Sequence, residues 1–198
     1  ERDVVEWIIY PLNEAEREEF QACDPKSGKH HVPRHKSLDC SIMDAADDIA
    51  YGVHDLEDAI ALGLITKEDL AAALQDKCPS FLDALKEKYP NESANDVFSH
   101  FVEGLCGASG TRKRFISRLV HHFITAAEFE EKDAFSEPLV RYRVMLKQPQ
   151  RDFLKVLKDF VAEQVILSPS VQHLEFKGQT MVVSVFEALQ ADPKRLLP

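Results

Sequence analysis

The sequence predicts an all-helical protein, and three observations lead to that class. Apolar residues recur at three- and four-residue steps, which is the period of an α-helix. The chain has only 7 glycines in 198 residues and few alternating apolar and polar runs, which favours helices over a barrel or sandwich. Capping residues and prolines separate the periodic segments. We therefore expect one helical unit over residues 1–198, with at most one small β-hairpin near residues 139–147.

The first segments of the chain are short. The apolar run Val4–Tyr10 is stopped by Pro11. Asn13 then caps a polar helix that reaches about Cys23, with glutamates near its start, where acidic side chains suit the helix dipole. The stretch Asp24–Lys36 is rich in Pro, Gly and His and is expected to be a loop.

A longer central helix is expected over about residues 38–62. Ser37 or Ser41 opens it, and Ser41-x-x-Asp44 resembles a capping box. Gly63 is expected at its C-terminal end. The apolar stripe suited to burial comprises Ile42, Ala46, Ile49, Val53, Leu56 and Ile60.

Six more helices and one strand are expected after the central helix. Each helix starts at a capping residue or a proline, or shows helical periodicity. The predicted helices are Thr66–Gln75, Pro79 to before Pro90, Asn95–Leu105, Thr111–Lys132, Asp152–Val165 and Pro169–Leu189. The Thr111–Lys132 helix has Phe115, Leu119, Phe123 and Ala126 on its core side. Leu139–Leu146 alternates apolar and polar residues and is the strand candidate.

Charge and cysteine usage exclude several broad classes. The formal net charge of −10 argues against general adhesion to nucleic acid or anionic membranes; binding of single-stranded DNA in a local groove stays possible but is not indicated. The four cysteines lie far apart without a C-x-x-C pair, so we expect reduced thiols in a cytoplasmic protein. No apolar run approaches the roughly 20 residues that span a bilayer, so no membrane partner is expected.

The central helix carries the strongest candidate site. Asp47, Tyr51 and Asp55 stand at i, i+4 and i+8, so they form one row along the helix. Carboxylates in such a row can supply oxygen ligands to a divalent cation, and the row can also hold the polar edge of a ligand. The alternative is an ordinary solvated face. His54 and Asp55 point about 100° apart on a helix and cannot chelate one ion together.

Histidine pairs elsewhere and one basic segment are further candidates. The loop His30-His31 with His35, and His121-His122 in a later helix, are interpreted as exposed or packed residues because no zinc signature surrounds them. Arg112, Arg114 and Arg118 lie at the front of the helix that starts at Thr111. A positive helix start with guanidinium groups suits phosphate, although arginines there also commonly form surface ion pairs.

These patterns together favour a hydrolase acting on phosphate bonds. The absence of a Walker loop, a G-x-S-x-G elbow and a G-x-G-x-x-G motif excludes P-loop phosphotransfer, α/β-hydrolase and Rossmann chemistry. Acidic ligands and a basic phosphate site in a helical protein point towards metal-assisted hydrolysis of a phosphoester or phosphoanhydride.

Two segments carry a resemblance to a known family. A-D-D-I-A-Y-x-x-x-D-L-E-D (46–58) resembles the last metal-ligand motif of the deoxyguanosine triphosphate triphosphohydrolase family of the HD-domain superfamily. L-S-P-S-V-Q-H-L-E-F-K-G-Q (167–179) and the final A-D-P-K-R-L-L-P are similar to that family's C-terminal segment. Arg34-His35 and the Arg-rich helix start at Arg112 also fit. The resemblance implies an HD-domain-like helical bundle, of which this chain is the C-terminal part.

The resemblance also implies an activity and roles for residues. The family hydrolyses a deoxynucleoside triphosphate to deoxynucleoside and inorganic triphosphate with a divalent metal ion such as Mg²⁺ or Mn²⁺, and its members commonly form homo-oligomers. Asp47 matches the final metal ligand of a His…His-Asp…Asp site. Tyr51 and Asp55 match positions that face the deoxyribose, and Arg112, Arg114 and Arg118 would neutralise the polyphosphate.

One departure from the family pattern limits this expectation. The first family His and the His-Asp pair should precede the central helix, but no histidine precedes His30. We therefore expect this chain to carry only part of the active site, with catalytic residues unknown, and to bind metal weakly and hydrolyse little by itself. The alternative is a catalytically incompetent module that binds nucleotide or assembles oligomers.

Overall fold

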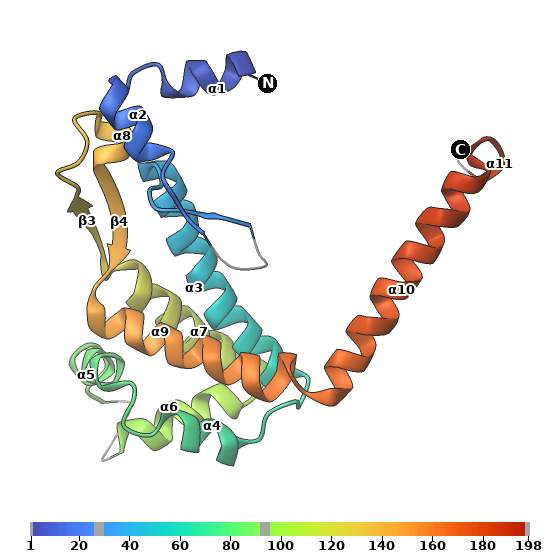
Figure 1. Cartoon of the computed structure of the whole chain (residues 1–198). Coiled ribbons are helices and arrows are strands. Elements are labelled where there is room, and N and C mark those ends of the chain that lie inside the picture. Colours follow the sequence, from blue (N-terminus) through green and yellow to red (C-terminus); the bar gives the residue numbers. More distant parts are fainter. Residues whose placement is uncertain (1, 26–29, 92–95, 197–198) are drawn as a thin grey trace.

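The computed structural model describes residues 2–25, 30–91 and 96–196 and confirms the all-helical class (Figure 1). Two short antiparallel strand pairs accompany the helices. The elements are α1 (Arg2–Ile9), α2 (Glu14–Phe20), β1 (Cys23–Asp24), β2 (Val32–Pro33), α3 (Leu38–Ala61), α4 (Lys67–Leu74), α5 (Pro79–Lys88), α6 (Val97–Cys106), α7 (Ser109–Ile124), β3 (Ala127–Glu131), α8 (Pro138–Arg141), β4 (Tyr142–Leu146), α9 (Gln148–Val161), the π-helical turn η1 (Ala162–Ile166), α10 (Pro169–Ala191) and α11 (Pro193–Leu196).

Helix α3 is the axis of the molecule. It packs against α9, α7 and β4. In Figure 1, α2 and the β3–β4 hairpin lie at one end of α3, whereas α7 and α9 lie beside its other end. Helices α7 and α9 cover this second half of α3. Ile49, Val53 and Leu56 are therefore buried. At the other end Ile42 is 44% exposed and Ala46 is also exposed, so the predicted apolar stripe was wrong there.

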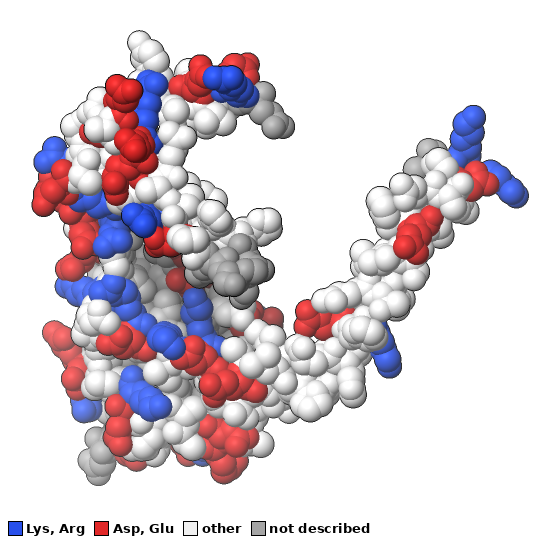
Figure 2. All heavy atoms as spheres, in the orientation of Figure 1, with Lys and Arg blue, Asp and Glu red and all other residues white. Residues whose placement is uncertain are grey.

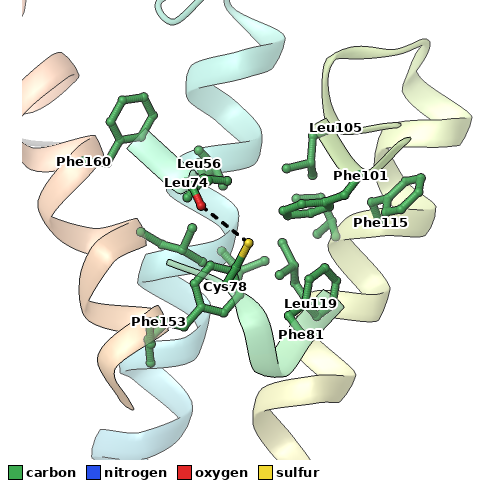
Figure 3. Close-up of a cluster of buried hydrophobic side chains, with 14 of the residues drawn as sticks. Leu56, Leu74, Cys78, Phe81, Phe101, Leu105, Phe115, Leu119, Phe153 and Phe160 are labelled. Atoms are coloured by element: carbon green, nitrogen blue, oxygen red, sulfur yellow. Dashed lines mark hydrogen bonds between the residues drawn. The ribbon is translucent and has the colours of Figure 1, made fainter. Parts of the chain in front are cut away.

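Aromatic side chains fill the centre of the helical bundle. Phe81 and Phe101 meet edge to face with ring centroids 4.9 Å apart, and Phe115 and Phe153 lie beside them (Figure 3). All four rings are at most 1% exposed. The predicted core side of α7 is confirmed, because Phe115, Leu119 and Phe123 are buried and Ala126 follows just after the helix.

Predicted capping residues fix the starts of α2, α3 and α4. Asn13 and Thr66 each form a complete capping box with the third helical residue. Ser37 caps α3 by accepting a hydrogen bond from the Cys40 amide at 3.3 Å. Ser41 does not cap the helix; its hydroxyl donates to the Leu38 carbonyl and accepts from the Val144 amide at 2.8 Å. Gly63 follows the end of α3 with φ +68°, as predicted for a helix C-terminus.

The predicted helix Thr111–Lys132 is wrong in its last third. Helix α7 ends at Ile124, and Ala127–Glu131 forms strand β3, which pairs antiparallel with β4. Glu130 lies opposite Arg143 and forms an ion pair with it, and Glu128 pairs with Lys147 at 3.0 Å. Cross-strand pairing of this kind overrides the helical preference of the glutamates. The hairpin itself was expected, but its second strand starts at Tyr142 because Pro138–Arg141 forms a helical turn.

The N-terminal helices attach through a separate small cluster. Leu12, Phe135 and Val140 are buried together. The Glu16 carboxylate accepts hydrogen bonds from the Ser136 amide at 2.5 Å and the Ser136 hydroxyl at 2.7 Å. These hydrogen bonds hold the pKa of Glu16 below its usual value, so the carboxylate ties α2 to the segment before α8 as an anion.

The last long helix stands apart from the body of the molecule. Helix α10 leaves η1 and projects away from the bundle (Figure 1). None of its residues is buried. No helix in the described parts of the chain combines the length and apolar character that crossing a membrane requires.

Candidate functional site

The predicted row of Asp47, Tyr51 and Asp55 lies on the side of α3 opposite its buried stripe. Asp47 is exposed, Tyr51 is 38% exposed and Asp55 is half-buried. Successive members of the row are about 6 Å apart along the helix axis, because four residues rise by that distance. Among the described residues, the Asp47 carboxylate has no hydrogen-bond or ion-pair partner, so its oxygens are open to a ligand.

Asp55 has an environment that differs from that of a fully solvated carboxylate. Its partial burial, followed by the negative charge of Asp58, raises the pKa of Asp55, and the neighbouring His54 acts in the opposite direction. His54 itself faces Glu57, with its Nδ1 3.4 Å from a Glu57 carboxylate oxygen. Asp55 is therefore a carboxylate with an incomplete set of polar partners, suited to accept a hydrogen bond from a ligand hydroxyl.

A cation from α9, which the sequence did not point to, adjoins the row. Lys158 Nζ lies 5.8 Å from the centre of the Tyr51 ring and forms an ion pair with Asp48. Gly52 makes this approach possible, because a Cβ there would lie 2.6 Å from Leu154 Cδ1 and 3.2 Å from Lys158 Cγ. The only sequence signal was a glycine inside a helical pattern, which often marks a close contact with another element.

The three predicted phosphate-binding arginines lie on α7 but do not point in one direction. Arg112 donates to the Gly107 carbonyl at 3.3 Å. Arg114 is exposed. The Arg118 guanidinium stacks 3.7 Å above the centre of the Tyr89 ring, in a hollow between α5 and α7. Neither Arg112 nor Arg114 forms an ion pair with Asp47 or Asp55 among the described residues.

The Arg112 side chain nevertheless has one feature of an incomplete site. Its Nε is buried and, within the described parts of the chain, has no hydrogen-bond partner. A buried guanidinium donor left without an acceptor is unfavourable by about 1–3 kcal/mol, so an acceptor supplied by a ligand would stabilise this end of α7.

The histidines weighed as metal ligands have ordinary neighbours. His35 contacts Glu19, with Nε2 2.6 Å from Glu19 Oε1, and packs on the Phe135 ring. His122 packs edge to face against Phe81, and burial lowers its pKa, so the neutral ring is favoured.

The residues present do not build a metal site by themselves. The described part of the chain contains no cluster of three or more His, Cys, Asp or Glu side chains that could hold an ion. A divalent cation requires several ligands, and Asp47 offers one carboxylate. The donor set in the described residues therefore does not fit a complete Mg²⁺ or Mn²⁺ site.

Known proteins resemble this chain along its full length. Residues 144–198, from β4 onwards, match a family described as a phosphohydrolase-associated domain. The chain is 42% identical over 197 residues to a deoxyguanosinetriphosphate triphosphohydrolase-like protein of Shewanella sediminis (strain HAW-EB3), which covers 98% of this chain and 43% of that protein. A protein of the same name from Vibrio vulnificus (strain YJ016) is 38% identical over 202 residues, covering 100% of this chain and 44% of that protein. The chain thus spans less than half the length of these curated relatives.

Proposed function

Because the chain is homologous along its length to the deoxyguanosinetriphosphate triphosphohydrolase-like family, matching its C-terminal portion, we propose that it forms part of the active site of a phosphohydrolase. The proposed reaction is hydrolysis of dGTP or another deoxynucleoside triphosphate to the deoxynucleoside and inorganic triphosphate. The observation that carries the proposal is the row Asp47, Tyr51 and Asp55, which lies along one side of α3 within the segment that resembles the family motif.

The proposal gives each member of the row one role. Asp47, which has no partner among the described residues, would supply one oxygen ligand to a divalent cation, and the described residues do not provide the others. When bound, such a cation neutralises charge on phosphate. Tyr51 and Asp55 bind the sugar hydroxyl: the phenol donates or accepts a hydrogen bond, and the partly desolvated carboxylate accepts one. Lys158 keeps a positive charge beside the Tyr51 ring.

The arginines of α7 have a supporting role in this proposal. The front of α7 carries Arg112 and Arg114, and cations there are suited to phosphate oxygens. The buried, unpaired Nε of Arg112 supports this role, because an oxyanion would complete its hydrogen bonding. Arg118 is the weakest member of the set, since its guanidinium is already stacked on Tyr89.

A chimera tests the proposal directly. This chain replaces the corresponding part of the Shewanella sediminis relative, and the product is incubated with dGTP and Mn²⁺ or Mg²⁺. We expect release of inorganic triphosphate, and we expect Asp47→Asn to reduce the rate at least about 100-fold, since a metal ligand is lost. Asp39→Asn removes an exposed carboxylate from the same helix and is the matched control. Release of pyrophosphate, or equal rates for Asp47→Asn and Asp39→Asn, would refute the mechanism.

A second candidate function is homo-oligomer assembly, and helix α10 favours it. Large apolar side chains of α10 are more than half exposed: Leu174, Phe176, Met181, Val182, Val183, Val185 and Phe186. Because the last five fall within six consecutive residues, they surround the helix, and a helix that is apolar on all sides is typical of a buried element. We propose that a second copy of this chain covers α10.

Light scattering after size exclusion tests this candidate. We expect the chain to form oligomers and Val182→Glu/Phe186→Glu to be monomeric, because the two charges fall on one side of α10, one turn apart. Lys177→Glu/Gln190→Glu changes exposed polar residues of the same helix and should leave the oligomer intact. A monomeric wild-type chain would eliminate the candidate.

A further inference from the structure

A hollow lined by cations lies between α3, α9 and the β3–β4 hairpin. Its volume is about 590 Å³. We call it the basic groove, defined by the lining cations Arg34, Lys36, Lys132, Arg143, Arg151, Lys155 and Lys158. Figure 2 shows Lys and Arg side chains gathered where the hairpin meets α9. In a chain of net charge −10, this concentration of cations is a local reversal of the overall charge.

Carboxylates within the molecule neutralise only part of this charge. Asp44, Asp48 and Asp159 are the acidic residues of the lining, and they pair with Lys36, Lys158 and Lys155 respectively. Residues outside the lining pair with two more cations: Asp24 with Arg34, and Glu130 with Arg143. Seven cations therefore face five carboxylates.

Lys132 and Arg151 are the two cations left over. The Lys132 ammonium donates to the Lys36 backbone carbonyl at 3.1 Å, and Arg151 donates to the neutral Gln148 amide oxygen. Within the described parts of the chain, neither cation forms an ion pair. Burial and then the positive charge of Arg143 lower the pKa of Lys132, which is the effect expected where positive charges are not fully compensated.

The shape and lining of the basic groove select the class of anion. Its volume falls within the range of small-molecule sites, about 300–1,000 Å³. None of the described residues that line it is aromatic, whereas single-stranded nucleic acid binds on aromatic stacking platforms. Cations on three separate elements can instead contact successive phosphates of one short chain.

We propose that the basic groove binds a small linear polyphosphate, either inorganic triphosphate or the triphosphate of a nucleotide. Lys132 and Arg151 supply the uncompensated charge, and the cations of α9 and β4 surround the ligand. Asp47, Tyr51, Asp55 and the arginines of α7 are absent from the lining. Lys158 is the one lining cation that also adjoins the row on α3, so the test variant leaves Lys158 unchanged and relies on Lys132 and Arg151.

Calorimetric titration of the 198-residue chain tests this proposal. The probe is sodium triphosphate without metal, and the test variant is Lys132→Gln/Arg151→Gln, which breaks no ion pair. We expect binding by the wild-type chain and at least about tenfold weaker binding by the variant, since each loses a charge-assisted contact. Lys86→Gln/Lys177→Gln removes the same amount of charge away from the groove and should bind as the wild type does. Circular dichroism establishes that all variants are folded.

Other arms of the titration identify the ligand and separate the two proposals. Equal affinity for dGTP and triphosphate supports a site that contacts only the phosphates of the ligand. No binding of triphosphate by the wild-type chain, or equal weakening by the groove and control variants, would overturn the proposal. Tighter binding of a 12-nucleotide oligothymidylate would assign the groove to nucleic acid and also overturn it. Loss of binding in Arg112→Gln/Arg114→Gln alone would place the anion at α7, supporting the proposed function and overturning the groove.

Discussion

Replacing Gly104 by alanine tests the packing that holds α6 against α7. A Cβ at this position would lie 2.0 Å from Cε2 and 2.2 Å from Cδ2 of the Phe115 ring. The ring is 1% exposed, and Phe101 and His100 lie beside it. A rigid ring in this position cannot move aside without displacing its neighbours, so Gly104→Ala forces α6 and α7 apart.

The magnitude follows from two opposing effects. Alanine improves helix propensity by about 1 kcal/mol over glycine. Overpacking a well-filled core is unfavourable by about 1–3 kcal/mol, and the contact here is close enough for the upper part of that range. We therefore expect a net destabilisation of about 1–2 kcal/mol, which lowers the Tm of a protein of this size by roughly 2–8 °C.

Urea unfolding followed by circular dichroism measures the effect. Gly110→Ala is the matched control, because Gly110 lies in the first turn of α7 and nothing lies within 4 Å of a Cβ there. The control should be as stable as the wild type or more stable by up to about 1 kcal/mol, because it gains helix propensity without a clash. In Gly104→Ala/Phe115→Leu, the smaller side chain relieves the clash, so the double variant should be more stable than additivity predicts by at least about 0.5 kcal/mol. An unchanged or higher stability of Gly104→Ala, or strict additivity, would refute the reasoning.

Three further predictions concern the site and the thiols. Gly52→Ala should displace α9 from α3 and lower stability by about 1 kcal/mol in urea unfolding, because its Cβ would meet Leu154; a stabilised variant would contradict this packing. The pKa of Asp55 is raised on folding, so the folded state binds its proton more tightly than the unfolded state does. The contribution of Asp55 to the free energy of unfolding therefore falls as pH rises from 3.8 through the folded pKa. Asp55→Asn should therefore raise the Tm at pH 7, with the difference from the wild type vanishing below pH 3.8; an identical Tm at pH 7 would disprove this. Burial raises the pKa of Cys78 to about 11, so iodoacetamide at pH 8 should label the exposed Cys23 and Cys40 in the native protein while Cys78 reacts only after unfolding, as mass spectrometry would record.

The sequence by itself determined the local features of this protein. Helix class follows from periodicity, and the starts of α2 and α4 follow from the side-chain chemistry of Asn13 and Thr66, which acts over three or four residues. The row on α3 also follows directly, because residues four apart on a helix must lie on one side. The roles assigned to this row rest on the family resemblance and stay predictions.

Tertiary structure decided the features that depend on neighbours distant in sequence. Residues 127–131 look helical in isolation, but β4 offers cross-strand partners and the segment becomes a strand. Ile42 fits the apolar stripe, yet it lies away from the part of α3 that α7 and α9 cover and is exposed. Lys158 reaches Tyr51 only because Gly52 lets α9 approach α3, and the basic groove combines cations from α3's flanking loop, the hairpin and α9. Long-range packing set these contacts, because burial and pairing energies between distant segments outweigh local propensity.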